Sequence, residues 1–224
     1  MHYSLEVCEA FLTALRRLQA GISGRAVVIG VDGRAGSGKT IFSHLLADTL
    51  GRLGGKVLRL RFDAFWLFGQ EFEDLVAALP ELAVSAPAPG DYDYAWQLCR
   101  ERLLARLRAG TAADPELRRL VAACCADDAA ADPDAADWVI LEGTTCLRRE
   151  LRASYDLSLL LRLDPQVCLR QWLAREQGQG ADYFVNIWRP LEARYFEEHQ
   201  PEAAADFVID TLLARSAFLL STGV

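Results

Sequence analysis

One stretch of the chain limits its fold more than any other feature. Residues 33–40 (GRAGSGKT) fit the pattern G-x-x-x-x-G-K-[ST] and follow an apolar, β-branched run at 26–31 (AVVIGV). A helical pattern at 40–50 comes next and ends at Gly51. The sequence therefore predicts a buried strand, a glycine-rich turn and a helix in direct succession. This context disfavours a glycine-rich turn that fits the pattern by accident.

Each residue type in the turn has a physical role in binding phosphate. Glycines allow positive φ, so successive backbone N–H groups can surround phosphate oxygens, and the start of the helix adds its positive end. Lys39 is expected to reach the terminal phosphates, and the Thr40 hydroxyl to ligate Mg²⁺. The pattern thus predicts a site for a nucleoside triphosphate. Its predicted binding residues are Gly33, Arg34, Ala35, Gly36, Ser37, Gly38, Lys39, Thr40 and Ile41.

Strand-like and helix-like patterns alternate along the chain. The expected strands are 26–31, 56–62, 138–141, 157–163 and 207–209. The expected helices are 4–20, 40–50, 94–109, 116–125, 165–177 and 189–199. Residues 80–90 contain three prolines and are predicted to be a loop, and the acidic, Ala-rich 126–137 a solvated connection. This order is typical of a parallel sheet covered by helices.

Composition excludes other kinds of protein. The 224 residues carry 24 Lys+Arg against 31 Asp+Glu, a net charge of −7, without the basic cluster that nucleic-acid binding needs. We expect no membrane association, because no run approaches the roughly 18 uncharged apolar residues of a membrane span and no signal-peptide order is present. The six cysteines lack C-x-x-C spacing, which favours reduced thiols in a cytoplasmic protein over a zinc site. Assembly into a homo-oligomer is left open.

Two classes of protein that use the same loop do not fit. A GTPase needs Asn-Lys-x-Asp to read guanine, yet the one asparagine in the chain, Asn186, is not followed by lysine. A motor, transporter or AAA-type ATPase generally has a larger body and an apolar strand that ends in Asp-Glu. The corresponding strand here ends in a lone carboxylate, Glu142, followed by Gly143. Neither class is therefore expected.

Several further segments carry a resemblance to a known family. They are VVIGVDGRAGSGKT at 27–40, FDAFW at 62–66, YDYAW at 92–96, VILEG at 139–143, LRLDPQVCLRQWLARE at 161–176 and RPLEARYFEEHQPEAAADFVID at 189–210. With these segments the chain resembles the uridine kinase-like branch of small-molecule P-loop kinases, which includes phosphoribulokinase and pantothenate kinase. The resemblance implies one three-layer α/β domain over 1–224, with a five-stranded parallel sheet in the order 2-3-1-4-5. A helical lid at about 165–195 is implied too.

Two carboxylates match functional positions of that family. Asp63 follows the second strand, where the family's acidic residue faces the acceptor hydroxyl as general base or through Mg²⁺. Glu142 matches the family's strand-end Glu-Gly, a partner of the Mg²⁺ shell. The alternative for each is a surface or helix-capping carboxylate. Asp32, just before the loop, is expected to be structural.

The resemblance also implies arginines that close over the triphosphate. Arg170 and Arg175 are the catalytic candidates, and Arg189, with Arg194 beyond it, follows on the next helical segment. Five residues on a helix turn through about 500°, so the first two arginines point some 140° apart. Both can face the phosphates only if the helix ends between them. A solvated surface role is the alternative for each arginine.

The acceptor site is predicted from aromatic and acidic residues that suit a base and ribose hydroxyls. Its candidates are Asp63, Phe65, Tyr92, Asp93 and Arg189, and packing in the core is the alternative for the aromatic residues. Three hypotheses stay open. The first is an ATP- and Mg²⁺-dependent kinase of a nucleoside such as uridine or cytidine. The second is a kinase of a pantothenate-like, sugar-like or other alcohol, and the third is a nucleotide-dependent binding or regulatory protein with little transfer.

Overall fold

The computed structural model describes residues 2–66, 95–110, 114–125 and 135–211, with side chains from residue 11 onward. The predicted loop at 80–90 and most of the predicted connection at 126–137 lie outside these residues. So do two of the acceptor-site candidates, Tyr92 and Asp93.

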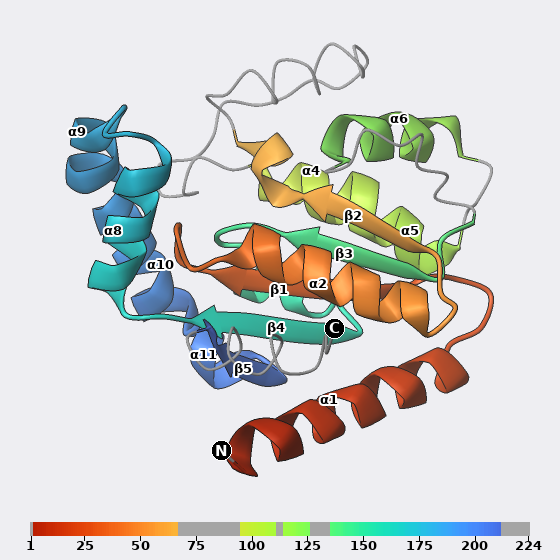
Figure 1. Cartoon of the computed structure of the whole chain (residues 1–224). Coiled ribbons are helices and arrows are strands. Elements are labelled where there is room, and N and C mark those ends of the chain that lie inside the picture. The colour runs from red at the N-terminus through yellow and green to blue at the C-terminus, as the bar shows by residue number, and fades with distance from the viewer. Residues whose placement is uncertain (1, 67–94, 111–113, 126–134, 212–224) are drawn as a thin grey trace.

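A five-stranded parallel sheet forms the middle layer (Figure 1). Its strands are β1 (Val27–Gly33), β2 (Val57–Arg61), β3 (Trp138–Glu142), β4 (Leu157–Arg162) and β5 (Phe207–Asp210). They lie in the order β2-β3-β1-β4-β5, so the predicted fold class and strand order are confirmed. β1 extends two residues beyond its predicted end because Asp32 and Gly33 still pair with β4.

Within the described residues, one face of the sheet is covered by α1 (His2–Gly21) and α2 (Lys39–Arg52). Apolar side chains of both helices pack against alternate residues of the strands, as the two periodicities require. The buried members of this cluster are Leu15, Val27, Ile29, Val31, Phe42, Leu46, Leu50, Trp138, Ile140, Leu157, Leu159 and Leu161. Phe11 of α1 meets Phe207 of β5 edge-on. These contacts place the start of α2, and the loop before it, at the carboxyl edge of the sheet.

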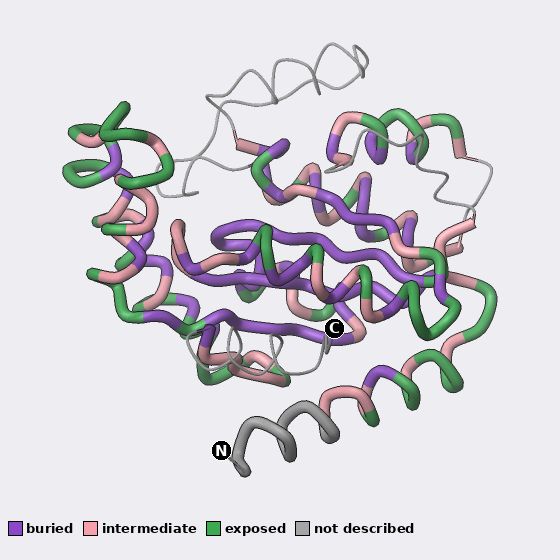
Figure 2. Tube along the Cα trace, viewed as in Figure 1, coloured by how far each residue is buried: buried purple, intermediate pink, exposed green. Residues whose placement is uncertain are grey.

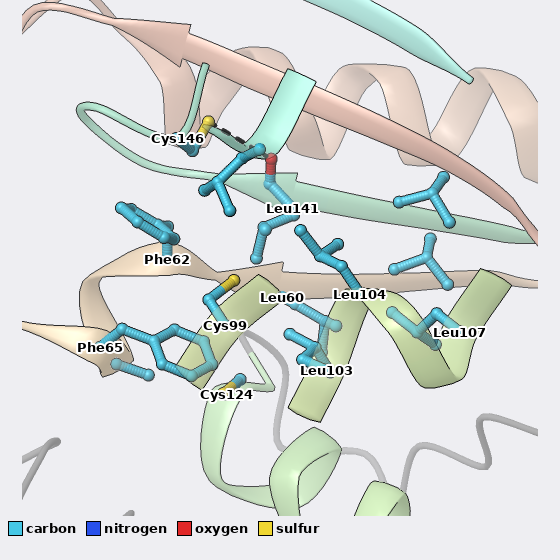
Figure 3. Packing of buried hydrophobic residues seen from close by; sticks show 14 of the residues in the cluster. Leu60, Phe62, Phe65, Cys99, Leu103, Leu104, Leu107, Cys124, Leu141 and Cys146 are labelled. Atoms are coloured by element: carbon cyan, nitrogen blue, oxygen red, sulfur yellow. Dashed lines mark hydrogen bonds between the residues drawn. The ribbon is translucent and has the colours of Figure 1, made fainter. Parts of the chain in front are cut away.

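In the part of the chain that the structure describes, the opposite face carries a long helix and two shorter ones. The predicted helix at 94–109 is continuous from Trp96 to Ala109, as α4 (Trp96–Leu98), a π-helical stretch (Cys99–Leu104) and α5 (Ala105–Ala109). Beside it lie α6 (Pro115–Cys124), which Asp114 caps, and α7 (Arg149–Arg152). Figure 3 shows how Cys99 and Cys124 pack among leucines and phenylalanines beneath β2 and β3. The five cysteines of the described side chains are all free thiols.

The remaining helices stand beyond the carboxyl ends of the strands (Figure 1). They are α8 (Pro165–Arg175), α9 (Ala181–Tyr183), a π-helical stretch (Phe184–Trp188), α10 (Arg189–His199) and α11 (Pro201–Ala204). Asp164 caps α8 by accepting the N–H groups of Gln166 and Val167, and Pro165 occupies its first turn. α8 therefore starts directly after β4, close to the phosphate-loop motif.

Candidate functional site

The phosphate-loop motif connects the end of β1 to the start of α2, as predicted. Gly36 has φ +84° and Gly38 has φ +93°, a region that side chains with a Cβ rarely adopt. The Ser37 N–H donates to the Arg34 carbonyl at 2.9 Å, which closes a tight turn. The loop has the curved backbone that a phosphate group requires, and α2 begins at its end.

Lys39 lies folded back across this loop. Its ammonium donates to the carbonyls of Gly33 at 2.9 Å and Arg34 at 3.1 Å, and to the Thr144 hydroxyl at 3.0 Å. Lys39 is 9% exposed, so its positive charge is held at the loop and is shielded from solvent. Sequence reasoning did not find Thr144. Its position directly after the strand-end Glu142-Gly143 was the available signal.

The two predicted metal-binding residues lie together. The Thr40 hydroxyl donates to a carboxylate oxygen of Glu142 at 3.1 Å. Burial raises the pKa of the Glu142 carboxyl; the Lys39 ammonium opposes this rise, and the negative charge of Asp63 adds to it. A hydroxyl and a carboxylate oxygen are ligands of the type that Mg²⁺ takes in proteins, so the residues present fit this ion.

Asp63 reaches the same edge of the sheet from β2. Arg61 pairs with Glu142 in the sheet register, and a 3₁₀ turn (Phe62–Phe65) follows it. A Cβ on Gly143 would lie 3.3 Å from an Asp63 carboxylate oxygen and 2.6 Å from Phe62, so Gly143 permits this close approach. Asp63 itself is exposed. Its carboxylate is thus open to solvent beside the buried Glu142.

The prediction for Phe65 is corrected by the structure. Residues three apart on a 3₁₀ helix point the same way, so Phe62 and Phe65 both turn into the core and are fully buried (Figure 3). The Phe65 ring packs in the hydrophobic cluster and forms no open surface. The neighbouring Trp66 is half-buried, with its ring centroid 6.4 Å from that of Tyr183 and 6.2 Å from that of Trp188. Unlike Phe62 and Phe65, Trp66 therefore turns toward the helices beyond the sheet.

Asp32 is the structural residue that the sequence predicts, and it joins three segments. One carboxylate oxygen accepts the N–H groups of Gly33 and Thr145, and the other accepts the Leu147 N–H and the Tyr195 hydroxyl, the latter at 2.5 Å. Burial raises the pKa of this carboxyl, and the hydrogen bonds from Tyr195, Leu147 and Gly33, together with the charge of Lys39, oppose the rise. Thr145 has φ +70°, an unusual conformation for a β-branched residue. Asp32 therefore holds the segment that carries Thr144 against the phosphate loop.

The predicted lid arginines do not gather in this conformation. α8 runs without a break through Arg170 and Arg175, so the condition under which both could face the phosphates is not met. Both are exposed, and Arg175 pairs with the adjacent Glu176 at 2.6 Å. Arg189 is half-buried at the start of α10. The roles of these three residues stay predictions.

A pocket of about 430 Å³ lies on the other side of the loop, between the carboxyl ends of β4 and β5. Its lining is half apolar and half charged: Arg34, Leu160, Leu161, Arg162, Leu163, Asp164, Pro165, Phe196, Glu202 and Asp210. The Arg34 guanidinium lies over the Phe196 ring at 4.1 Å from its centroid and forms the wall next to the loop.

Comparisons with known proteins agree with this geometry at the level of the fold. No protein-family model and no curated protein matches the chain. A solved structure described as a possible uridine kinase from Bacillus stearothermophilus matches 90% of this chain and all of its own, with 19% identity and a TM-score of 0.54. A candidate fructose transport system kinase from Silicibacter sp. TM1040 matches 89% of this chain and 97% of its own, with 19% identity and a TM-score of 0.53. The chain has a P-loop kinase-like fold.

In this P-loop kinase-like fold, four of the predicted residues meet at one edge of the sheet. Lys39 and Thr40 begin α2, Asp63 follows β2 and Glu142 ends β3, so all four lie at the carboxyl edge of the sheet, where ligands of open α/β sheets bind. Ile41, the last predicted nucleotide-binding residue, has an exposed side chain on the first turn of α2. Over the described ranges, no helix is both long and apolar enough to cross a membrane.

Proposed function

We propose that the protein transfers the γ-phosphate of ATP to a hydroxyl group of a small molecule. The observation that carries this proposal is the meeting of Lys39, Thr40 and Glu142 with the exposed carboxylate of Asp63 at the carboxyl edge of the sheet. A positive charge for phosphate oxygens and a carboxylate for a hydroxyl proton are the two functions that phosphate transfer to an alcohol needs.

We place the triphosphate on residues 33–40 and its base and ribose in the pocket beside Arg34. The pocket adjoins the loop and has both apolar walls and charged groups, as a nucleoside requires. Thr40 and Glu142 would hold Mg²⁺, which neutralises phosphate charge when it is bound. Lys39 then exchanges the Thr144 hydroxyl and the loop carbonyls for phosphate oxygens.

Asp63 would act as the general base. A carboxylate oxygen of Asp63 accepts the proton of the acceptor hydroxyl as that oxygen bonds to the γ-phosphorus. The bond between the γ-phosphorus and the bridging oxygen breaks, and ADP leaves with the electron pair. Because Glu142 is buried and Asp63 is exposed, the acceptor can reach only the second of these carboxylates.

The resemblance of the sequence to uridine kinases favours a nucleoside such as uridine or cytidine as the acceptor. Pantothenate-like, sugar-like and other alcohols remain alternatives. A protein that binds nucleotide with little transfer is the second candidate function, and the separation of Arg170 and Arg175 on one unbroken helix favours it. A cytoplasmic location stays a prediction from the reduced cysteines.

The test is consumption of Mg-ATP in the presence of nucleosides, pantothenate and sugar alcohols in turn, with products identified by mass. A gain of one phosphate on a single acceptor would establish the kinase function and its substrate. Tight ATP binding without transfer to any acceptor would favour the binding or regulatory function. Absence of ATP binding would refute the assignment of the phosphate loop.

A further inference from the structure

Helix α10 contacts the phosphate loop in a way that the proposed chemistry does not use. The carboxylate of Glu192 accepts the backbone N–H of Ala35 at 2.7 Å with one oxygen. Its other oxygen accepts a guanidinium N–H of Arg34 at 2.9 Å. Glu192 is 4% exposed, and it lies more than 150 residues away in sequence. A buried acidic residue from another part of the chain therefore holds the first half of a loop that is built to receive anions.

Burial of this carboxylate is not explained by stability alone. A buried ion pair loses hydration on both sides, and its net contribution to folding is often near zero. The arrangement does fix the orientation of the groups that contact the carboxylate. The carboxylate orients the Ala35 peptide group, and it fixes the Arg34 side chain, which would otherwise have several rotamers beside the loop.

The next turn of α10 contacts the first residue of the same loop through Asp32. Residues three apart on a helix share a face, and Tyr195 follows Glu192 by three. The Tyr195 hydroxyl donates to Asp32, whose other oxygen accepts the Gly33 N–H. Between these contacts, Phe196 lies beneath the Arg34 guanidinium. One face of α10 thus holds the loop at its first residue and again two residues later.

We propose that Glu192 is a positioning residue of the phosphate loop: it holds the Ala35 N–H and the Arg34 guanidinium so that the loop is preformed for the triphosphate. This inference rests on the proposed function, because it concerns how the same loop binds the phosphates. It assigns to α10 a role that needs no contact with the nucleotide. The negative charge stays neutralised by Arg34, so it does not repel phosphate.

The test compares binding of ATP with binding of AMP, which lacks the β- and γ-phosphates, by calorimetry in the full chain. We expect Glu192→Ala to weaken ATP binding about tenfold and AMP binding less than twofold. Glu192→Gln keeps an acceptor for the Ala35 N–H, so we expect it to recover ATP affinity to within about threefold of the parent. The matched control is Glu198→Ala, which removes a surface carboxylate of the same helix that pairs with Arg194. It should leave both affinities unchanged.

The outcomes separate this inference from the proposed function. If the parent protein does not bind ATP, the proposed function fails. If the parent binds ATP and Glu192→Ala binds both nucleotides as the parent does, the positioning role fails, whatever the change in melting temperature. Tighter ATP binding by Glu192→Gln would show that the carboxylate repels phosphate, which would also overturn the inference.

Discussion

The two halves of the site differ in how they are built. In the proposed function, the half that faces the donor lies at the start of α2 and the end of β3, where hydrogen bonds hold Lys39, Thr40 and Glu142 at the sheet edge. The half that faces the acceptor has the exposed Asp63 and helices that stand clear of the sheet, with much exposed surface around α9 (Figure 2). Groups that the core holds are in place before a ligand arrives, whereas we expect groups on the outlying helices to take their positions only if these helices close as the proposed lid.

The largest effect should come from breaking the donor half at Lys39. We expect Lys39→Ala to reduce transfer by at least about 10³-fold, because the charge that meets the terminal phosphates is lost. Steady-state kinetics on the identified acceptor measure the loss. Lys56→Ala, at the only other lysine, is the control and should retain the parent rate. A transfer rate of Lys39→Ala close to that of the parent would refute the phosphate-loop mechanism.

Asp63→Asn tests the proposed acceptor half of the site separately. The amide keeps the size of the carboxylate and cannot take a proton, so we expect transfer to fall by about 10²–10³-fold. ATP affinity should stay within a few-fold, since the donor half is intact. Single-turnover rates and ATP titrations distinguish the two quantities. Asp48→Asn changes an exposed carboxylate of α2 and serves as the control. Transfer at the parent rate in Asp63→Asn would remove Asp63 from the mechanism.

Gly36 tests how closely α8 supports the phosphate loop. A Cβ at this position would lie 2.3 Å from the Cys168 carbonyl oxygen of α8, at a φ of +84°. We expect Gly36→Ala to destabilise the fold by roughly 3 kcal/mol in urea unfolding and to weaken ATP binding. Gly54 has a similar φ of +88° with nothing within 4 Å, so Gly54→Ala should destabilise by only about 1 kcal/mol. Equal losses in the two variants would mean that contact with α8 does not shape the loop.

The smallest expected effect concerns His199, at the end of α10. Its Nδ1 accepts the Arg149 N–H at 3.2 Å, which only the uncharged ring can do. Burial lowers the pKa of His199; Glu150 opposes this shift, and three nearby arginines add to it. The unfolded chain, with a histidine pKa of about 6.5, binds this proton first, so stability should decline as pH falls from about 7.5 toward 5.5.

Urea unfolding across this pH range, for the parent and for His199→Gln, measures the effect. Glutamine keeps an acceptor for the Arg149 N–H and does not titrate, so its stability profile should be flatter over this range. Parallel profiles would show that His199 does not contribute to the pH dependence.

The sequence predicts the sheet-edge half of the site better than the half on the outlying helices. Local sequence patterns predict the strands and the loop at 33–40, and the family resemblance implies the order of the strands in the sheet. The proximity of Thr40 and Glu142 could therefore be expected. The contact of Lys39 with Thr144 and that of Ala35 with Glu192 join segments more than 100 residues apart, and no local pattern encodes them. The lid arginines depend on how α8 is oriented beyond the sheet, which helical periodicity does not specify.

The aromatic side chains of the acceptor half give the protein an optical property. Trp138 is sealed in the sheet, whereas the other four tryptophans lie on that side or on the helices beyond it: Trp66, Trp96, Trp172 and Trp188. The Trp172 ring is stacked on Phe184 with centroids 3.7 Å apart, on segments that must move together if the lid closes. Four of the five tryptophans therefore lie outside the sheet, where a ligand that contacts these helices would change their surroundings. We expect the tryptophan emission of the unlabelled chain to change when a ligand binds there, while the buried Trp138 contributes a steady background.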